Sequence, residues 1–280
     1  MPAFPTPGPI DLAVTVQVGG LHVVAGDRSD TVVTVSPTTP SRAEDRRAAE
    51  QTRVQFDGTR LEIVGPKPRF AVIGPNESID VRVELPAGSR LTASIGWVRT
   101  EGRLGATRIK STLGYVDVEA TGDLELRAMH GNATVGRADG TAEIVADHGQ
   151  IRAGTITGNA ILKASHGSVQ VDECGGDLEA KLSYGDLAIG KAGGSVSAKT
   201  AYGEVRLGEV SSGAIDVESG YGRISIGVRR GVPAWLDLSS KDGGRVRNAL
   251  EGDRAPSPSE QAVAVRARTR SADIDIRRAR

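Results

Sequence analysis

Cysteine, aromatic residues and long apolar runs are all scarce in this chain, and each shortage excludes a class of protein. Cys174 is the only cysteine among 280 residues, so an intramolecular disulfide is impossible. Aromatic residues make up only 3% of the chain, less than wide sandwich cores and ligand pockets usually contain. No stretch approaches the roughly 18 apolar residues of a transmembrane helix, so the sequence predicts no membrane span.

The chain also lacks an excess of charge of either sign. Its 35 basic and 35 acidic residues cancel, so no global field favours specific binding to nucleic acid or to an anionic membrane. The N-terminal residues MPAFPTPGPIDLAV contain neither the basic nor the apolar segment of a signal peptide. From these absences we expect a soluble, cytoplasmic protein.

Glycine, in contrast, is abundant, and many of its 36 residues fall into two regular columns. The first column advances by 17 to 19 residues and consists of Gly96, Gly114, Gly131, Gly149, Gly167, Gly185, Gly203 and Gly222. The second column runs half a period out of phase and consists of Gly105, Gly122, Gly140, Gly158, Gly176, Gly194 and Gly213. Such self-similarity at a short fixed period predicts a stacked repeat.

Apolar and polar residues alternate after the glycines, which predicts short strands with one buried face. The expected buried set in three successive coils is Val169, Val171, Leu187, Ile189, Val205 and Leu207. The intervening Gln170, Ala188 and Arg206 are expected to face water. Stacked at roughly 4.8 Å per strand, these segments form an all-β, single-stranded β-solenoid (β-helix) of about 18-residue coils. An antiparallel sandwich or barrel is the alternative, but its turns would not keep phase for seven periods.

The sequence predicts two regions. Residues 10–90 contain strand-like runs and one short helix at about 41–51, where Ser41 and Glu44 fit a capping box. We expect this region to be a β-rich cap that covers the first edge of the solenoid. Residues 91–280 are expected to form about eight regular coils followed by irregular C-terminal coils. The polar, proline-rich segment 251–260 predicts an inserted surface loop.

The residue before each first-column glycine gives one candidate metal site. His130, His148 and His166 would stack one coil apart and could together meet a metal ion. The next three coils carry tyrosine at this place, and a phenol is a poor zinc ligand, so the pattern favours a packed ladder of rings. We therefore expect no metal and no other cofactor.

Glycine–aspartate pairs such as Gly176–Asp177 suggest comparison with calcium-binding nonapeptide rolls. Those rolls need a second glycine and an aspartate in every turn, whereas the same column here holds Asn159 and Ser195. No catalytic Ser/His/Asp set, P-loop or dinucleotide fingerprint is present. Cys174 falls in an apolar turn column and is expected to be a small buried hydrophobe. The sequence therefore predicts no catalytic residues.

Two features predict contact surfaces. Trp97 and Tyr115 occupy an outward column in the first two coils, where a cover is expected, either from the N-terminal region or from a partner molecule. Near the other end, residues 223–280 hold thirteen basic and seven acidic residues. Arg266, Arg268 and Arg270 there are expected to keep a last edge strand from pairing with another chain, or to bind an anionic polymer.

Several segments resemble a known bacterial family. Repeated units such as TGDLEL, GGDLEA, YGDLAI and YGEVRL look like a β-strand-repeat family of unknown function, a domain family of "putative adhesins". The closing VPAWLDLSSKDGGRVRNAL and VRARTRSADIDIRR are similar to the tail of its soluble, signal-less members. The resemblance covers residues 10–278 and implies a fold rather than catalytic residues. The family name implies a secreted or surface protein, which would need an export route.

Three functional classes follow from these observations. The chain is expected to be a non-enzymatic interaction or scaffold module in the cytoplasm, monomeric, with an unknown protein or an anionic polymer as its partner. The first alternative is a surface adhesin. The second is a self-assembling β-helix of the cytoskeletal type.

Overall fold

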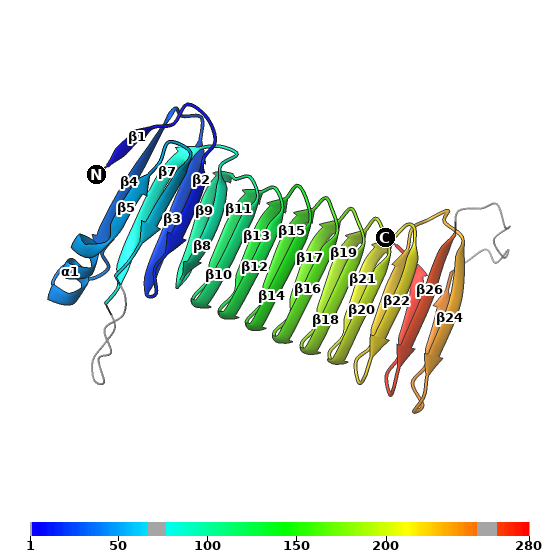
Figure 1. Ribbon diagram of the computed structural model, residues 1–280. Helices are drawn as coiled ribbons and strands as arrows, with labels where there is room; N and C mark the ends of the chain where they lie inside the picture. Colours follow the sequence, from blue (N-terminus) through cyan, green and yellow to red (C-terminus); the bar gives the residue numbers. More distant parts are fainter. Residues whose placement is uncertain (1, 67–76, 251–261, 280) are drawn as a thin grey trace. The chain divides into compact units, whose positions relative to one another are not determined.

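A computed structural model describes residues 2–66, 77–250 and 262–279 of the chain (Figure 1). The chain forms two compact units, Met1–Arg137 and Ala138–Arg280, and both are built almost entirely of β-strands. The loop predicted at residues 251–260 lies outside the described residues.

Unit 1 contains one helix, α1 (Ala43–Gln51), and a series of short strands. The strands are β1 (Ala3–Pro5), β2 (Asp11–Thr15), β3 (Gly19–Gly26), β4 (Asp30–Pro37), β5 (Arg53–Phe56), β6 (Arg60–Val64), β7 (Ile79–Pro86), β8 (Arg90–Ile95), β9 (Trp97–Arg103), β10 (Thr107–Leu113), β11 (Val116–Thr121), β12 (Leu124–His130) and β13 (Ala133–Ala138). They form two sheets, in the orders β1-β4-β7-β3-β9-β11-β13 and β5-β6-β2-β8-β10-β12.

The N-terminal strands of unit 1 are paired out of chain order. β2 lies between β6 and β8 and is parallel to both, with Leu12 opposite Leu61 and Leu91. β3 lies in the same way between β7 and β9. Beyond them, β4, β1 and β5 pair antiparallel at the outer edges. Parallel pairing therefore continues on the N-terminal side of Leu91, and strands from both sides of residue 90 share sheets. A domain boundary at residue 90 stays a prediction.

The helix begins differently from the sequence prediction. α1 starts after Arg42, whose extended backbone forms the N-cap without a side-chain hydrogen bond, so the predicted Ser41–Glu44 capping box is wrong. The buried carboxylate of Asp45 instead accepts hydrogen bonds from the backbone N–H groups of Thr39 (3.1 Å) and Ser78 (3.0 Å). Asp45 thereby ties the first turn of the helix to the chain on either side of it.

Unit 2 repeats a pair of strands in each coil. The strands are β14 (Ala142–His148), β15 (Ile151–Ile156), β16 (Ala160–His166), β17 (Val169–Cys174), β18 (Leu178–Tyr184), β19 (Leu187–Ala192), β20 (Val196–Tyr202), β21 (Val205–Val210), β22 (Ala214–Ser219), β23 (Ile224–Val228), β24 (Ala234–Ser240), β25 (Val246–Ala249), β26 (Val263–Thr269) and β27 (Ile274–Arg278). Even-numbered strands form one parallel sheet, in the order β14-β16-β18-β20-β22-β26-β24, and β25 ends the other sheet beside β27.

The last strands of the chain are also paired out of order. β26 lies between β22 and β24 (Figure 1). In the other sheet, β27 lies between β23 and β25. The final strand pair is therefore interior, and the preceding pair occupies the edge.

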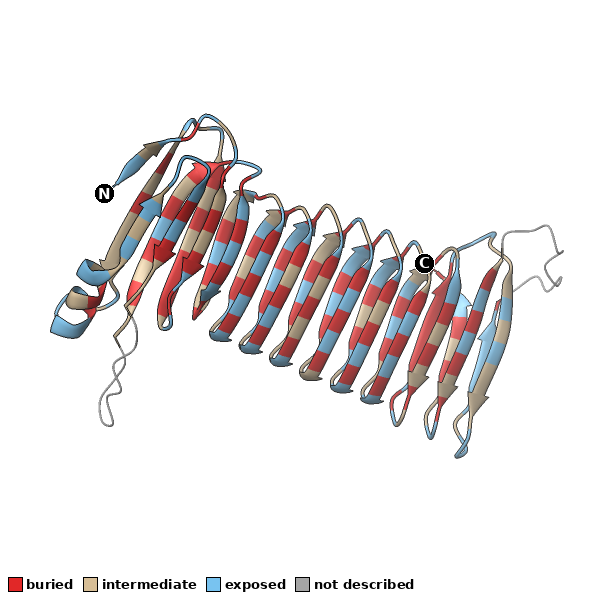
Figure 2. Cartoon of the chain, in the orientation of Figure 1, coloured by how far each residue is buried: buried red, intermediate tan, exposed pale blue. Residues whose placement is uncertain are grey.

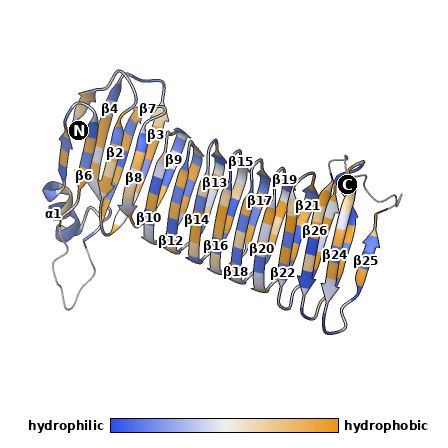
Figure 3. Ribbon diagram, turned by 45° about the vertical axis from the view of Figure 1, so that its right-hand side comes forward, coloured by the Kyte–Doolittle hydropathy of each residue, from blue (hydrophilic) through white to orange (hydrophobic). Residues whose placement is uncertain are grey.

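Strict alternation fills the core of unit 2 with aliphatic side chains (Figures 2 and 3). Val169, Leu187 and Val205 are paired in register on adjacent parallel strands, and so are Val171, Ile189 and Leu207. All six side chains are buried, while Gln170 and Arg206 are exposed and Ala188 is half-buried. The register predicted from the sequence is confirmed, and the fold is a β-solenoid.

The first glycine column stands where successive coils approach most closely. Gly185 has φ +141°, and a Cβ added to it would overlap the carbonyl oxygen of Gly167 in the preceding coil. Only a residue without a side chain satisfies both the backbone angle and the close approach. This is why glycine recurs with the period of the coil.

Candidate functional site

Two shallow grooves meet on the outer face of the even-numbered sheet in unit 2. One, of about 440 Å³, crosses β16, β18, β20 and β22. The other, of about 390 Å³, crosses β22, β26 and β24. Ala214 and Asp216 line both, so the two form one continuous hollow. We call this hollow the outer groove.

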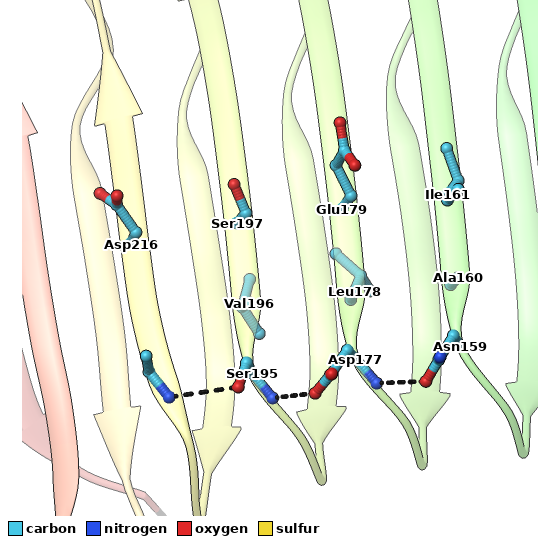
Figure 4. A pocket seen from close by; sticks show the side chains of 11 residues that line it. Asn159, Ala160, Ile161, Asp177, Leu178, Glu179, Ser195, Val196, Ser197 and Asp216 are labelled. Atoms are coloured by element: carbon cyan, nitrogen blue, oxygen red, sulfur yellow. Dashed lines mark hydrogen bonds between the residues drawn. The ribbon is translucent and has the colours of Figure 1, made fainter.

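One side of the outer groove is a ladder of polar side chains that joins successive coils (Figure 4). The Asn159 side-chain oxygen accepts from the Asp177 backbone N–H (2.9 Å), and the Asp177 carboxylate accepts from the Ser195 N–H (2.8 Å). Ser195 Oγ continues the ladder to the Ala214 N–H (3.3 Å). The aspartate of the Gly176–Asp177 pair therefore accepts a hydrogen bond from the backbone of the next coil. Each rung still presents a polar atom to solvent: an amide nitrogen, a second carboxylate oxygen or a hydroxyl hydrogen.

A second row runs beside the ladder and consists of Ile161, Glu179, Ser197 and Asp216 (Figure 4). Lys181 Nζ lies 2.5 Å from Glu179 Oε1, and this hydrogen bond holds the pKa of the Glu179 carboxyl below its usual value. Asp216 differs, because its Oδ1 is buried and has no hydrogen-bond partner among the described residues. A buried carboxylate oxygen without a partner is costly, so Asp216 is the most unusual polar group in the outer groove.

Trp235 stands at the far end of the outer groove, on the edge strand β24. Its side chain is 56% exposed. The neighbouring residues on the same outer face are Ala264, directly opposite it, and then Ala214. Because both are alanines, the floor beside the indole is low, and one face of the ring is open to a ligand.

Arg266 lies in the outer groove between two acidic residues, opposite both Asp216 and Asp237. Its Nε is 3.8 Å from Asp237 Oδ2, while Arg268 donates to the same oxygen at 2.9 Å. Arg270 ion-pairs with Asp242 at 3.7 Å. Arg266 and Arg268 belong to β26 and Arg270 directly follows it; β26 is interior, so the prediction that these arginines protect an edge strand is wrong. From the sequence, the last strands of the chain are expected to lie at the end of the sheet, because nothing in the local sequence indicates that β26 pairs between β22 and β24.

Trp97 and Tyr115 lie in unit 1, outside the outer groove. Their rings stack with centroids 5.5 Å apart, and Tyr115 is 48% exposed. Trp97 is half-buried, with its indole against the backbone of Gly20 in β3. The N-terminal region supplies the cover of Trp97, which was the first of the two covers expected from the sequence.

The predicted histidine ladder is a stack of parallel rings along one corner of unit 2. Adjacent centroids are 4.9–5.2 Å apart from His148 through His166, Tyr184 and Tyr202 to Tyr221. Rings stacked face to face direct their edge nitrogens side by side instead of toward one point. Within residues 2–66, 77–250 and 262–279, no group of three or more His, Cys, Asp and Glu side chains could hold a metal ion. His130 is in unit 1, on β12, opposite Leu113.

Cys174 is fully buried at the end of β17, as the sequence predicts. Burial raises the pKa of its thiol above the ordinary value, which disfavours the reactive thiolate.

A model of the family described as Toastrack DUF4097 matches residues 25–277. The chain belongs to this family. The resemblance seen in the sequence, to a β-strand-repeat family of unknown function, is thereby confirmed. No curated protein matches the chain. No helix in the described part of this Toastrack protein has the length and apolar character needed to cross a membrane.

Solved structures of low sequence identity align over nearly the whole Toastrack chain. A "putative adhesin" from Bacteroides fragilis is 11% identical, with 98% of this chain and 95% of that chain covered and a TM-score of 0.39. A "putative cell adhesion protein" from Clostridium sporogenes is 12% identical, with 99% and 98% covered and a TM-score of 0.24. A "putative adhesin" from Parabacteroides merdae is 8% identical, with 98% and 94% covered and a TM-score of 0.27. Such low similarity carries no argument about function.

The polar ladder of the Toastrack chain gives a stability prediction. Asp177→Ala removes the acceptor of the Ser195 N–H and should lower the free energy of unfolding by about 1 kcal/mol. Asp177→Asn keeps an acceptor oxygen and should be nearly neutral. Urea denaturation of both variants, with Ser197→Ala in the adjacent row as control, measures the difference. Equal losses for the alanine and asparagine variants would contradict a role as acceptor.

The ring stack gives a second prediction, on metal. Micromolar Zn²⁺ or a chelator should leave the melting temperature unchanged, because stacked imidazoles do not converge on one ion. Differential scanning calorimetry measures this. A rise in melting temperature with zinc that His148→Ala abolishes would restore the metal hypothesis.

Sequence reasoning missed Trp235 and Asp216. Trp235 stands in WLDL, where the glycine rhythm has already loosened, so its column could not be assigned by counting. Asp216 lies on the outer face, but nothing in the sequence around it indicates that one of its oxygens is buried.

Proposed function

We propose that this chain is a non-enzymatic interaction module that binds its partner in the outer groove of unit 2. The observation that carries the proposal is the buried, unpartnered Oδ1 of Asp216 at the junction of the two grooves. Once the half-buried Asp216 side chain turns toward the groove, a bound molecule can stabilise this oxygen by donating a hydrogen bond to it. Trp235, exposed at one end of the same hollow, supplies apolar area of the kind that dominates contact energy.

The charges of the outer groove bear on the choice of partner. Its acidic residues are Asp177, Glu179, Asp216 and Asp237, and the basic residue among its lining residues is Arg266. An anionic polymer, expected from the arginines in the sequence, would be repelled by this lining. Arg268 is paired with Asp237 and Lys181 with Glu179, which leaves Asp177 and Asp216 as the acids that face a ligand, while Arg270 is paired with Asp242. A neutral partner is favoured.

Location and oligomeric state are part of the same proposal. We place the protein in the cytoplasm as a monomer. Its outermost N-terminal strands, β1 and β5, are short and antiparallel, and two proline positions, Pro2 and Pro5, flank or end β1. Such edges resist addition of further strands. Cell fractionation and sedimentation velocity test the two statements.

Affinity capture with matched variants tests the function. The full chain, immobilised, should retain a partner from native extract, and Trp235→Ala and Asp216→Ala should both release it. Tyr184→Ala removes an aromatic ring of similar exposure (51%) on the corner stack and should retain the partner. Equal recovery by all four proteins would place the contact elsewhere and overturn the proposal.

A further inference from the structure

The outer groove has the form of a site for an extended chain. It crosses six adjacent strands, in the order β16, β18, β20, β22, β26 and β24. At a strand spacing of roughly 4.8 Å, its length is about 24 Å. It is shallow along all of this length, which suits a linear ligand lying across the strands better than a compact small molecule.

Polar groups recur along the outer groove with the spacing of the strands. On the ladder side, Asn159, Asp177 and Ser195 present a donor, an acceptor and a hydroxyl, each just before one of the successive strands β16, β18 and β20. In the adjacent row, Ser197 on β20, Asp216 on β22 and Arg266 on β26 present a hydroxyl, an acceptor and a donor, in the reverse order. A ligand that matches both rows needs hydroxyl groups, which donate and accept, at intervals close to the strand spacing. Sugar units of an extended polysaccharide have about this repeat.

Trp235 supplies the apolar contact that such a ligand needs. The face of an indole carries negative π density, and the C–H bonds on one face of a sugar ring are weakly positive and apolar. The open face of Trp235 beside Ala264 and Ala214 leaves room for a flat ring. In the ring stack from His148 to Tyr221, by contrast, neighbouring rings cover one another's faces and expose their edges.

We propose that the outer groove binds a neutral, linear glycan chain, with one terminal sugar ring stacked on Trp235 and a hydroxyl donating to the Asp216 carboxylate. This deepens the proposed function and rests on it, because it names the ligand class of the same surface. The acidic lining excludes uronic acid and other anionic polymers. A peptide strand is excluded by geometry, since the groove runs across paired strands and not along a free edge.

Isothermal titration of the full chain with neutral oligosaccharides tests the proposal. The probes are cellohexaose and chitohexaose, with hexagalacturonate as the acidic comparison. We expect a neutral hexamer to bind and the acidic hexamer to bind at least about tenfold more weakly. Trp235→Ala and Asp216→Ala should each weaken the neutral hexamer by about tenfold or more, while Tyr184→Ala should leave affinity unchanged.

Fluorescence gives a second measurement that does not depend on the alanine variant. The chain has two tryptophans, so Trp97→Phe leaves Trp235 as the reporter. Stacking of a sugar ring should shift its emission to the blue, and the concentration dependence should agree with the titration. The glycan released afterwards should be intact, since the proposal includes binding without cleavage.

Four outcomes would overturn the glycan proposal. They are no binding by either neutral hexamer, tighter binding of hexagalacturonate, affinity unchanged in Trp235→Ala, or cleavage of the probe. If the neutral hexamers fail to bind while capture of another partner still depends on Trp235 and Asp216, the interaction module stands and the glycan inference fails. If capture is also independent of both residues, the two fail together.

Discussion

A chain shortened to residues 91–280 should aggregate, or melt at least about 10 °C below the full chain. The deletion removes β2 and β3, which pair with β8 and β9, and so leaves both strands with a free edge. It also removes fully buried Leu12, Val14, Leu21 and Val23 from the core. Loss of even one such side chain costs about 2–5 kcal/mol, and an open edge is a template for strands of other molecules. Size-exclusion chromatography and calorimetry measure the outcome.

Two substitutions in the full-length chain distinguish the effect of disrupting the buried core from the effect of shortening the chain. Leu12→Asp places a charge at a position that is 1% exposed and should reproduce much of the instability. Ala13→Asp, on the opposite face of β2, should be tolerated. A soluble, monomeric 91–280 fragment of unchanged stability would instead mean that the N-terminal region is an independent domain.

Gly185→Ala should lower the free energy of unfolding by about 3 kcal/mol or more. A residue with a side chain at φ +141° is strained by about 1–3 kcal/mol, and the new Cβ would also overlap Gly167 O in the neighbouring coil. The stacked coils cannot move apart locally without breaking the hydrogen bond from the Gly167 N–H to Tyr184 O (2.9 Å). Denaturant unfolding followed by circular dichroism measures the loss.

Gly231→Ala isolates the effect of the backbone angle. Gly231 has φ +81° and nothing within 4 Å of an added Cβ, so only strain of about 1–2 kcal/mol is expected. Similar losses at Gly185 and Gly231 would show that close approach between coils contributes little.

The regular coils could be predicted from the sequence because the residues that determine each coil lie within about 18 residues of one another. Glycine spacing fixes the corners, and alternation such as Val169, Gln170, Val171 fixes which face is buried. These two signals gave the register that the structure has. The helix near residue 43 was also visible, but its N-terminus was not, because Asp45 bonds to Thr39 and to distant Ser78.

The order of strands near the two chain termini could not be predicted. β2 and β26 carry the same apolar alternation as the strands of the regular coils, so the pattern does not say with which neighbours they pair. Their pairing depends on how whole coils fit together over long sequence separations. For the same reason, the sequence pattern placed Arg266 at a sheet edge and did not show that Trp235 and Asp216 line the same groove.

Insertion of the chain's last strand pair between β22/β23 and β24/β25 limits where the protein can gain or lose length. A coil added after residue 279 would extend neither sheet, because β24 and β25 already occupy the outermost place in unit 2. In the middle, removal of Ser168–Gly185, eighteen residues, joins Gly167 to Asp186 as Gly185 is joined now, and deletes one whole coil. That deletion also takes β18 out of the outer groove. The number of internal coils therefore sets the length of the outer groove, and duplication or loss of a coil would change that length while leaving both ends of the fold as they are.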